Sequence, residues 1–133
     1  MADAVATTTV VDGSRKAVIY CTNTSDGTGE SAVTKVDVSG LSQNPDLDTC
    51  TGVRLEKVVF SNVGMGVKIL WDATTDVIAM ELPADYSDTI DFTDISGLPN
   101  YSGTGKTGDI QFTTVSHTSG DTYSVTLYCI KEY

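Results

Sequence analysis

The stretch GTGKTGD, residues 103–109, is spelled like the loop that grips phosphate in nucleotide hydrolases. That loop follows the pattern G-x-x-x-x-G-K-[ST], and it opens a helix whose N-terminal amides hold the anion. When the Gly-Lys-Thr at 105–107 is aligned to it, Asn100 stands where the first glycine belongs. The residues from Asp109 onward alternate like a strand, so no helix is predicted to frame an anion. The stretch is therefore predicted to be a glycine-rich turn between two strands.

Grouped carboxylates suggest a second chemistry, because carboxylate oxygens are the ligands that calcium prefers. One group is Asp46 with Asp48, and the other comprises Asp85, Asp88, Asp91 and Asp94. Neither group has the spacing of an EF-hand loop. Aspartates in loops and turns more often accept hydrogen bonds from nearby backbone amides. We expect them to cap turns and to form solvated surface, and we predict no metal site and no cofactor.

His117 is the only histidine, and its neighbours Ser116 and Ser119 suggest a nucleophile with its base. A hydrolytic triad also needs an orienting acid and an oxyanion hole, and the chain has no G-x-S-x-G elbow. The segment HTSGD is typical of a hairpin turn, so an exposed turn histidine is predicted. One histidine and three scattered cysteines do not reach the paired spacing of a zinc site. No catalytic residue is assigned, and the chain is not expected to be an enzyme.

The three cysteines are too widely spaced for a C-x-x-C motif. Cys21 and Cys129 lie inside apolar strand patterns, where cysteine behaves as a small hydrophobic residue, and both are predicted to be reduced and buried. Cys50 lies in the polar segment PDLDTCTG and is predicted to be the most exposed thiol. An odd exposed cysteine can pair between subunits. Cys50 is therefore a candidate intersubunit contact.

The charge of the chain excludes two classes of direct partner. The formal net charge is −10, and the imbalance is concentrated in the second half, where residues 67–133 carry 10 acids against 3 bases. Such a surface repels nucleic acid and anionic lipid. Lys106 is one of those three bases, so it is predicted to contact a carboxylate of a neighbouring subunit. The N-terminal stretch lacks the basic and apolar regions of a signal peptide, which favours folding in a cytosol.

Short runs with period-two alternation, separated by Gly, Asn, Asp and Ser, predict eight or nine β-strands. In residues 53–63 the alternation changes phase near Lys57, which predicts a bulge. The predicted strands are Ala4–Val11, Lys16–Thr22, Val33–Val38, Val53–Val63, Gly66–Trp71, Asp76–Leu82, Thr89–Ile95, Asp109–Val115 and Thr122–Ile130.

This pattern predicts an all-β fold with one domain over residues 1–133, an antiparallel β-sandwich of jelly-roll or other Greek-key type. A compact barrel is the alternative. Residues 1–11 are expected to form an N-terminal arm, because they lack a polar anchor and termini often become ordered only against a neighbour. The single Trp and the six Tyr could line a carbohydrate groove, although most fall on the core side of their strands and Trp71 is predicted to anchor the core.

Several stretches together resemble small β-rich structural proteins of the virions of tailed bacteriophages. The resemblance is one of overall pattern and covers almost the whole chain, with no catalytic motif among its residues. The stretches are SDGTGESAVTKVDVSGL (25–41), CTGVRLEKVVF (50–60), GMGVKILWDATTDVIAMEL (64–82), GTGKTGDIQFTTV (103–115) and SGDTYSVTLYCIKEY (119–133).

The resemblance implies a virion protein that is assembled in the cytoplasm of a bacterial host. It implies most directly a capsid decoration (cement) protein that binds the major capsid protein on the outer surface of the head as a homo-oligomer. The alternative is a component of the neck, collar or tail, including an adhesion module that uses its tyrosines on a sugar surface. The contacting surface is expected in the arm Met1–Val11 and in the turn regions Ser25–Ser31 and Asn44–Thr51.

Overall fold

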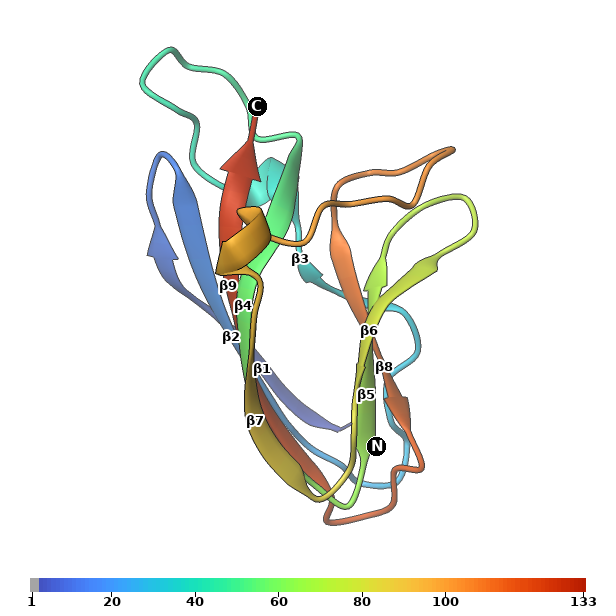
Figure 1. Cartoon of the computed structure of the whole chain (residues 1–133). Helices are drawn as coiled ribbons and strands as arrows, with labels where there is room; N and C mark the ends of the chain where they lie inside the picture. The colour runs from blue at the N-terminus through green and yellow to red at the C-terminus, as the bar shows by residue number, and fades with distance from the viewer. Residues whose placement is uncertain (1–2) are drawn as a thin grey trace.

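The computed structural model describes residues 3–133, and over this range the chain forms nine β-strands and two short 3-10 helices (Figure 1). The helices are η1 (Val38–Gly40) and η2 (Thr93–Ile95). The strands are β1 (Ala4–Asp12), β2 (Lys16–Thr24), β3 (Val33–Val36), β4 (Gly52–Val63), β5 (Gly66–Trp71), β6 (Val77–Leu82), β7 (Tyr86–Asp91), β8 (Ile110–Val115) and β9 (Thr122–Glu132).

The strands form two sheets that face each other as the layers of a sandwich (Figure 1). One sheet has the order β1-β2-β9-β4-β7 and the other has the order β3-β8-β5-β6. All neighbouring strands in both sheets run antiparallel. The sequence-based prediction of an all-β antiparallel sandwich is therefore confirmed, and the closed barrel is not the architecture of this chain.

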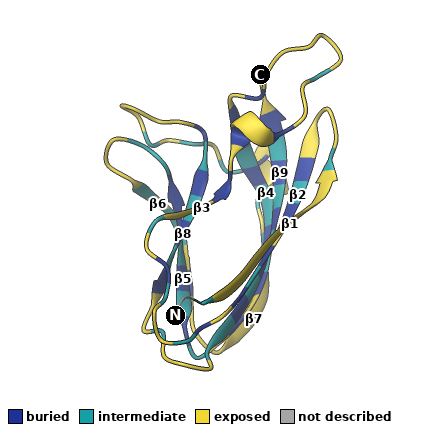
Figure 2. Ribbon diagram, turned by 180° about the vertical axis from the view of Figure 1, so that it is seen from behind, coloured by how far each residue is buried: buried dark blue, intermediate teal, exposed yellow. Residues whose placement is uncertain are grey.

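The core lies between the sheets and is one cluster with residues from strands of both layers. Figure 2 shows the buried positions along these strands. In β9 burial alternates strictly, as the sequence pattern predicts for a strand with one face in the core. Burying each large apolar side chain contributes about 1.5–3 kcal/mol. The largest fully buried side chains are Trp71, Tyr123, Phe112, Ile19, Leu55, Met65, Ile69, Leu82, Ile110 and Leu127.

A β-bulge divides β4, the longest strand. Its pairing with β9 shifts register between Leu55 and Lys57. Val53 and Leu55 point into the core before the shift, and Val58 and Phe60 do so after it. The extra residue thus lets both halves of the strand present apolar side chains to one core. The bulge predicted from the change of phase near Lys57 is confirmed.

One strand lies earlier in the chain than its sequence indicates. The alternation at 89–95 predicts a strand there, but β7 spans Tyr86–Asp91 and the chain then turns through η2. β7 pairs with β4 alone and is exposed along almost its whole length, with only Ile90 partly buried. An edge strand with a single partly buried residue carries almost no periodic signal, so the sequence does not locate its start.

The N-terminal segment is a strand of the five-stranded sheet. Residues 4–12 form β1, which pairs with β2 from Ala4 opposite Thr24 to Asp12 opposite Ala17. Asp3 precedes it and accepts hydrogen bonds from the backbone N–H groups of Asp26 and Gly29, both at 3.1 Å. The first two residues of the expected arm, Met1 and Ala2, lie outside the described residues.

No helix in the described range 3–133 has the length and apolar character needed to cross a membrane.

Candidate functional site

The glycine-rich stretch 103–109 is a turn that docks on the loop between β5 and β6. The Thr107 N–H donates to the Asp72 carbonyl at 3.1 Å, and the Thr107 hydroxyl donates to the Asp72 carboxylate at 2.8 Å. The Thr74 N–H donates to the Thr104 carbonyl at 3.3 Å. The chain continues directly into β8, a strand, so the helix that a phosphate-gripping loop requires does not follow it. The prediction of a turn is confirmed.

Lys106 lies at the exposed tip of this turn, and its backbone N–H donates to the Gly103 carbonyl at 3.2 Å. The turn borders a hollow of about 350 Å³ that is also lined by Thr51, Glu132 and Tyr133. An exposed lysine on an acidic chain is available to a carboxylate of another molecule, so its role as an intersubunit contact stays a prediction.

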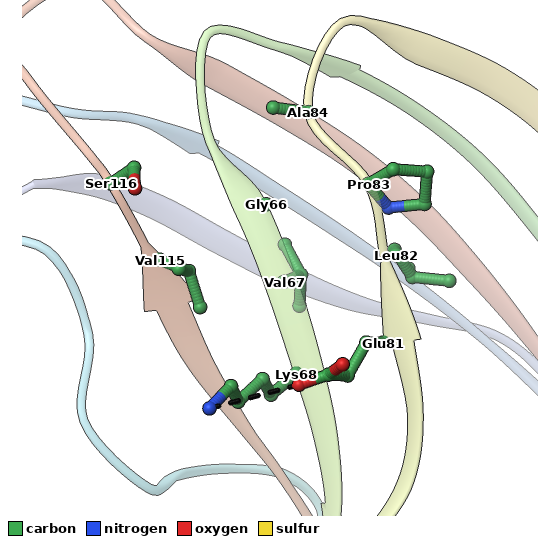
Figure 3. Close-up of a pocket in the computed structure, with 9 residues that line it drawn as sticks. All are labelled: Gly66, Val67, Lys68, Glu81, Leu82, Pro83, Ala84, Val115 and Ser116. Atoms are coloured by element: carbon green, nitrogen blue, oxygen red, sulfur yellow. Dashed lines mark ion pairs between the residues drawn. The ribbon is translucent and has the colours of Figure 1, made fainter.

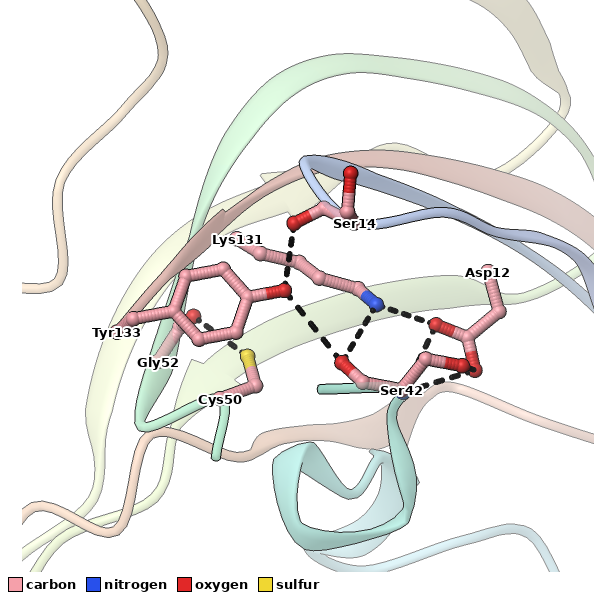
Figure 4. Close-up of polar contacts among 7 residues, drawn as sticks. All are labelled: Asp12, Ser14, Ser42, Cys50, Gly52, Lys131 and Tyr133. Carbon is pink, nitrogen blue, oxygen red and sulfur yellow. Dashed lines mark hydrogen bonds and ion pairs between the residues drawn. The ribbon is translucent and has the colours of Figure 1, made fainter. Parts of the chain in front are cut away.

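Cys50 is not the exposed thiol that its polar neighbours predict. The structure leaves only 2% of it exposed, and its Sγ lies 3.2 Å from the Gly52 carbonyl oxygen (Figure 4). The loop that carries it folds back onto the sandwich at this point, so the thiol joins the hydrophobic core. Cys21 and Cys129 are buried as expected, and all three cysteines are free. Cys50 therefore presents no thiol for contact with another subunit.

The native protein is expected to resist thiol labelling. Burial raises the pKa of Cys21 to about 11 and that of Cys129 to about 12, so both are protonated thiols at neutral pH, and the thiolate is the reactive form. An aromatic disulfide reagent at pH 7.5 should label the native chain only as fast as it opens, whereas all three cysteines should react at once in denaturant. Rapid labelling of one native cysteine would contradict the burial of Cys50.

Three aspartates of the second carboxylate group cap the backbone, as the sequence predicts for turn aspartates. Asp85 accepts from the Gly64 N–H at 2.8 Å, and Asp88 accepts from the Thr89 N–H at 2.7 Å. The Thr93 N–H, followed by the Thr93 hydroxyl, lowers the pKa of Asp91 below its usual value. Over residues 3–133, no three His, Cys, Asp or Glu side chains converge as a metal site would require.

His117 is partly buried, and the prediction of a freely exposed turn histidine is wrong. Its ring packs against Gly29, where an added Cβ would lie 2.3 Å from the ring atoms. Its Nδ1 lies 3.1 Å from the Thr114 hydroxyl, which in turn accepts from the Glu30 N–H at 2.8 Å. The histidine thus ties the β8–β9 turn to the segment between β2 and β3.

A polar cluster that sequence reasoning missed lies inside the sandwich beside this histidine. The carboxylate of Glu30 accepts from the Asn23 side chain at 2.8 Å and from the Tyr123 hydroxyl, and it forms an ion pair of 2.5 Å with Lys35. The side chains of Glu30 and Lys35 are 4% and 1% exposed. Burial, followed by the hydrogen bond to Glu30, raises the pKa of Tyr123 far above its usual value, so its hydroxyl remains a donor.

Lys35 enters the core because β3 is bulged. The pairing of β3 with β8 shifts between Thr34 and Val36, which leaves Lys35 unpaired and turns both it and Val36 inward. A bulge re-aims a side chain in this way, so the polar cluster depends on an irregularity of the backbone. The only sequence signal was a lysine between the apolar residues of a short strand, which ordinarily indicates the solvent-facing side.

A second buried lysine connects the central strand β9 and the edge strand β1 to the loop after η1 (Figure 4). The side chain of Lys131, in β9, is fully buried; it donates to Asp12 at the end of β1 and to the Ser42 carbonyl at 3.1 Å. Asp12 also accepts from the Ser42 N–H at 3.0 Å and from its hydroxyl at 2.9 Å. The Tyr133 hydroxyl donates to the Ser14 carbonyl at 2.6 Å.

The surface hollows offer little chemistry. One of about 400 Å³ lies over β5 beside Pro83, Ala84 and Val115, and the charged groups on its wall, Lys68 and Glu81, face each other at 3.7 Å across neighbouring strands (Figure 3). Another, of about 450 Å³, lies on the five-stranded sheet and is lined by small hydroxyl side chains and Tyr20, whose hydroxyl lies 2.6 Å from that of Ser124. Trp71 is fully buried in the core, so it is not available to a sugar.

The four edges of the sheets differ in a way that singles out β1. β7 carries Asp88 and Asp91, β6 carries Glu81, and β3 has only four residues. Charged or very short edge strands resist pairing with another chain. β1 has nine residues, carries no charge from Ala4 to Val11, and exposes both of its faces, including 59% of Val10. It is the long uncharged edge of the described fold and its best candidate for an interaction surface.

The chain matches no protein-family model, no curated protein and no solved structure.

Proposed function

We propose that this chain is a structural protein of a bacteriophage virion, and most directly a decoration protein on the outer surface of the head. The observation that carries the proposal is β1, a long, uncharged and exposed sheet edge on a protein whose net charge is −10. A strand edge binds by accepting another strand, because its free N–H and C=O groups form main-chain hydrogen bonds. The resemblance of several stretches between residues 25 and 133 to β-rich virion proteins supplies the partner, the major capsid protein.

Decoration requires neither an active site nor a cofactor. A protein that binds only the assembled lattice shifts the equilibrium toward it by mass action. A homo-oligomer that bridges neighbouring capsid subunits gains avidity from the repeated lattice without strong individual contacts. The acidic faces that remain exposed would keep particles mutually repulsive and soluble.

Copy number in purified virions tests the position in the particle. Quantitative mass spectrometry should find this chain at a level comparable to the major capsid protein, because decoration repeats with the lattice. A level comparable to the portal or to the tail tip would instead place the chain in the neck, collar or tail. Its absence from virions would overturn the proposal altogether.

A charge on β1 is expected to weaken the attachment. Thr8 lies opposite the exposed Tyr20 on the outer face of β1, so Thr8→Lys adds a charge to the edge without entering the core. We expect occupancy on stripped heads to require about tenfold more protein, equivalent to about 1.4 kcal/mol. Thr8→Val, which keeps the edge uncharged, is the matched control and should bind like the unaltered chain. Equal binding by the lysine variant would remove β1 from the interface.

A further inference from the structure

Three side chains with complementary reactivity meet in the interior of the sandwich. Lys35 supplies an amine, Asn23 supplies a carboxamide, and the carboxylate of Glu30 touches both. One oxygen of Glu30 lies 2.5 Å from Lys35 Nζ, and the other accepts from Asn23 Nδ2 at 2.8 Å. Asn23 is 2% exposed, so the whole group is shielded from water.

The fold brings these groups together from both layers. Asn23 lies near the end of β2 in the five-stranded sheet, and Lys35 lies at the bulge of β3 in the four-stranded sheet. Glu30 comes from the segment that crosses between them. Aromatic side chains close the site, since Tyr123 stands opposite Asn23 in the β2–β9 pairing and Lys35 Nζ lies 5.9 Å from the centre of the Phe112 ring.

We propose that Lys35 and Asn23 become joined by an intramolecular isopeptide bond, with Glu30 as the proton carrier. Glu30 takes a proton from the Lys35 ammonium, and the neutral Nζ attacks Cγ of Asn23. Glu30 then delivers that proton to Nδ2, and the bond between Cγ and Nδ2 breaks. One C–N bond forms and one breaks with no change of oxidation state. Ammonia departs as NH₃, and the remaining proton of the ammonium passes to Glu30, which ends as a neutral carboxyl group.

Two features of the site favour this reaction over a lasting ion pair. Burying an ammonium and a carboxylate costs several kcal/mol per ion, whereas the product, a secondary amide beside a protonated Glu30, carries no charge and removes that cost. The Asn23 carbonyl oxygen is buried without a hydrogen-bond partner. Once Glu30 holds the proton, this oxygen is free to accept a hydrogen bond from it, which polarises the carbonyl for attack by Lys35. Positioned groups in a dry site also avoid the entropy cost of a bimolecular encounter.

Tyr123 acts as a positioning residue. Its hydroxyl donates to the Glu30 oxygen that also accepts from Asn23, which fixes the carboxylate between the amine and the amide. Asp3 supports the other side, since it accepts from Asn23 Nδ2 at 3.0 Å.

Mass spectrometry of the unaltered protein tests the bond directly. The intact chain should weigh one ammonia less than its sequence requires. After denaturation, cleavage before aspartates should release residues 12–25 and 26–36 as a single branched species, because Asn23 lies in the first fragment and Lys35 in the second. Trypsin should fail to cut after Lys35 and should yield residues 17–54 as one peptide. A full sequence mass with separate fragments would overturn the proposal.

A deficit of one ammonia without joined fragments would also overturn it, since an asparagine that cyclises to a succinimide loses ammonia without reaching Lys35. Lys35→Arg and Glu30→Gln should both restore the full mass, one by removing the nucleophile and the other by removing the proton carrier. Lys16→Arg is the matched control, because Lys16 pairs with Glu56 at 2.9 Å on the surface and should leave the deficit unchanged. If either core variant fails to fold, the digest of the unaltered chain still decides.

Discussion

Replacing Asp12 with alanine should lower the free energy of unfolding by about 3 kcal/mol. Removing one partner of a buried ion pair costs about 3–5 kcal/mol, because the other charge stays buried and unpaired. Lys131 is fully buried and would keep only the Ser42 carbonyl, while the Asp12 side chain is 25% exposed, which places the expected cost at the low end of that range. Urea unfolding followed by circular dichroism measures the change.

The matched control for this variant replaces both partners. Asp12→Ala combined with Lys131→Met removes the charge together with its partner, so it should recover most of the lost stability. If Asp12→Ala lowers the free energy of unfolding by less than about 1 kcal/mol, which is the range of an exposed ion pair, then Lys131 and Asp12 are not shielded from water.

The same pair predicts a dependence on pH. Partial burial acts to raise the pKa of Asp12, but the hydrogen bonds from Lys131 and Ser42 outweigh it and lower the pKa below the usual 3.8. A carboxylate with a depressed folded pKa contributes stability above its unfolded pKa and loses it as the pH falls through the folded value. The acid-induced loss below pH 3.8 should therefore shrink in Asp12→Ala, leaving the part due to Asp3 and Asp91, whose pKa values are also lowered.

Trp71→Ala should cost about 3–5 kcal/mol, the range for truncating a large aromatic side chain in a core. Trp71 ends β5, is fully buried, and faces Val77 and Ile110 on the strands to either side. Its removal opens a cavity that the two paired neighbours cannot close without breaking register. Because it is the single tryptophan of the chain, unfolding has to be followed by circular dichroism.

Trp71→Phe is the informative comparison. The indole N–H is buried without a hydrogen-bond partner, so phenylalanine keeps an aromatic ring and removes an unsatisfied donor. We expect it to cost less than half as much as alanine. Equal costs for the two variants would show that the ring volume is not what stabilises this end of β5.

The elements that the sequence predicts well are those whose core contacts repeat. β9 alternates over its whole length, and β4 alternates on both sides of its bulge, so hydrophobic period alone locates them. The predicted position of β7 was wrong because an edge strand with a single partly buried residue has little hydrophobic period.

The residues of the polar cluster inside the sandwich cannot be predicted from hydrophobic period. Lys35 is buried because a bulge turns it inward. Glu30 is buried because its carboxylate has an ion-pair partner in Lys35 and hydrogen-bond donors in Asn23 and Tyr123. Neither condition is local in the sequence, since Tyr123 lies 93 residues from Glu30. Cys50 shows the same limit, because a polar neighbourhood in the sequence says nothing about how the loop folds back onto the core.

The position of β9 has a consequence for how the chain folds as it is synthesised. β9 is the last strand in the sequence, yet it lies at the centre of the five-stranded sheet, hydrogen-bonded to β2 on one side and β4 on the other. While β9 is still inside the ribosome, no strand joins the β1/β2 pair to the β4/β7 pair. The apolar faces of these pairs then have no complete core to pack against. The sheet therefore closes only after β9 has left the ribosome, and until then the nascent chain exposes unpaired strand edges, which are prone to aggregation.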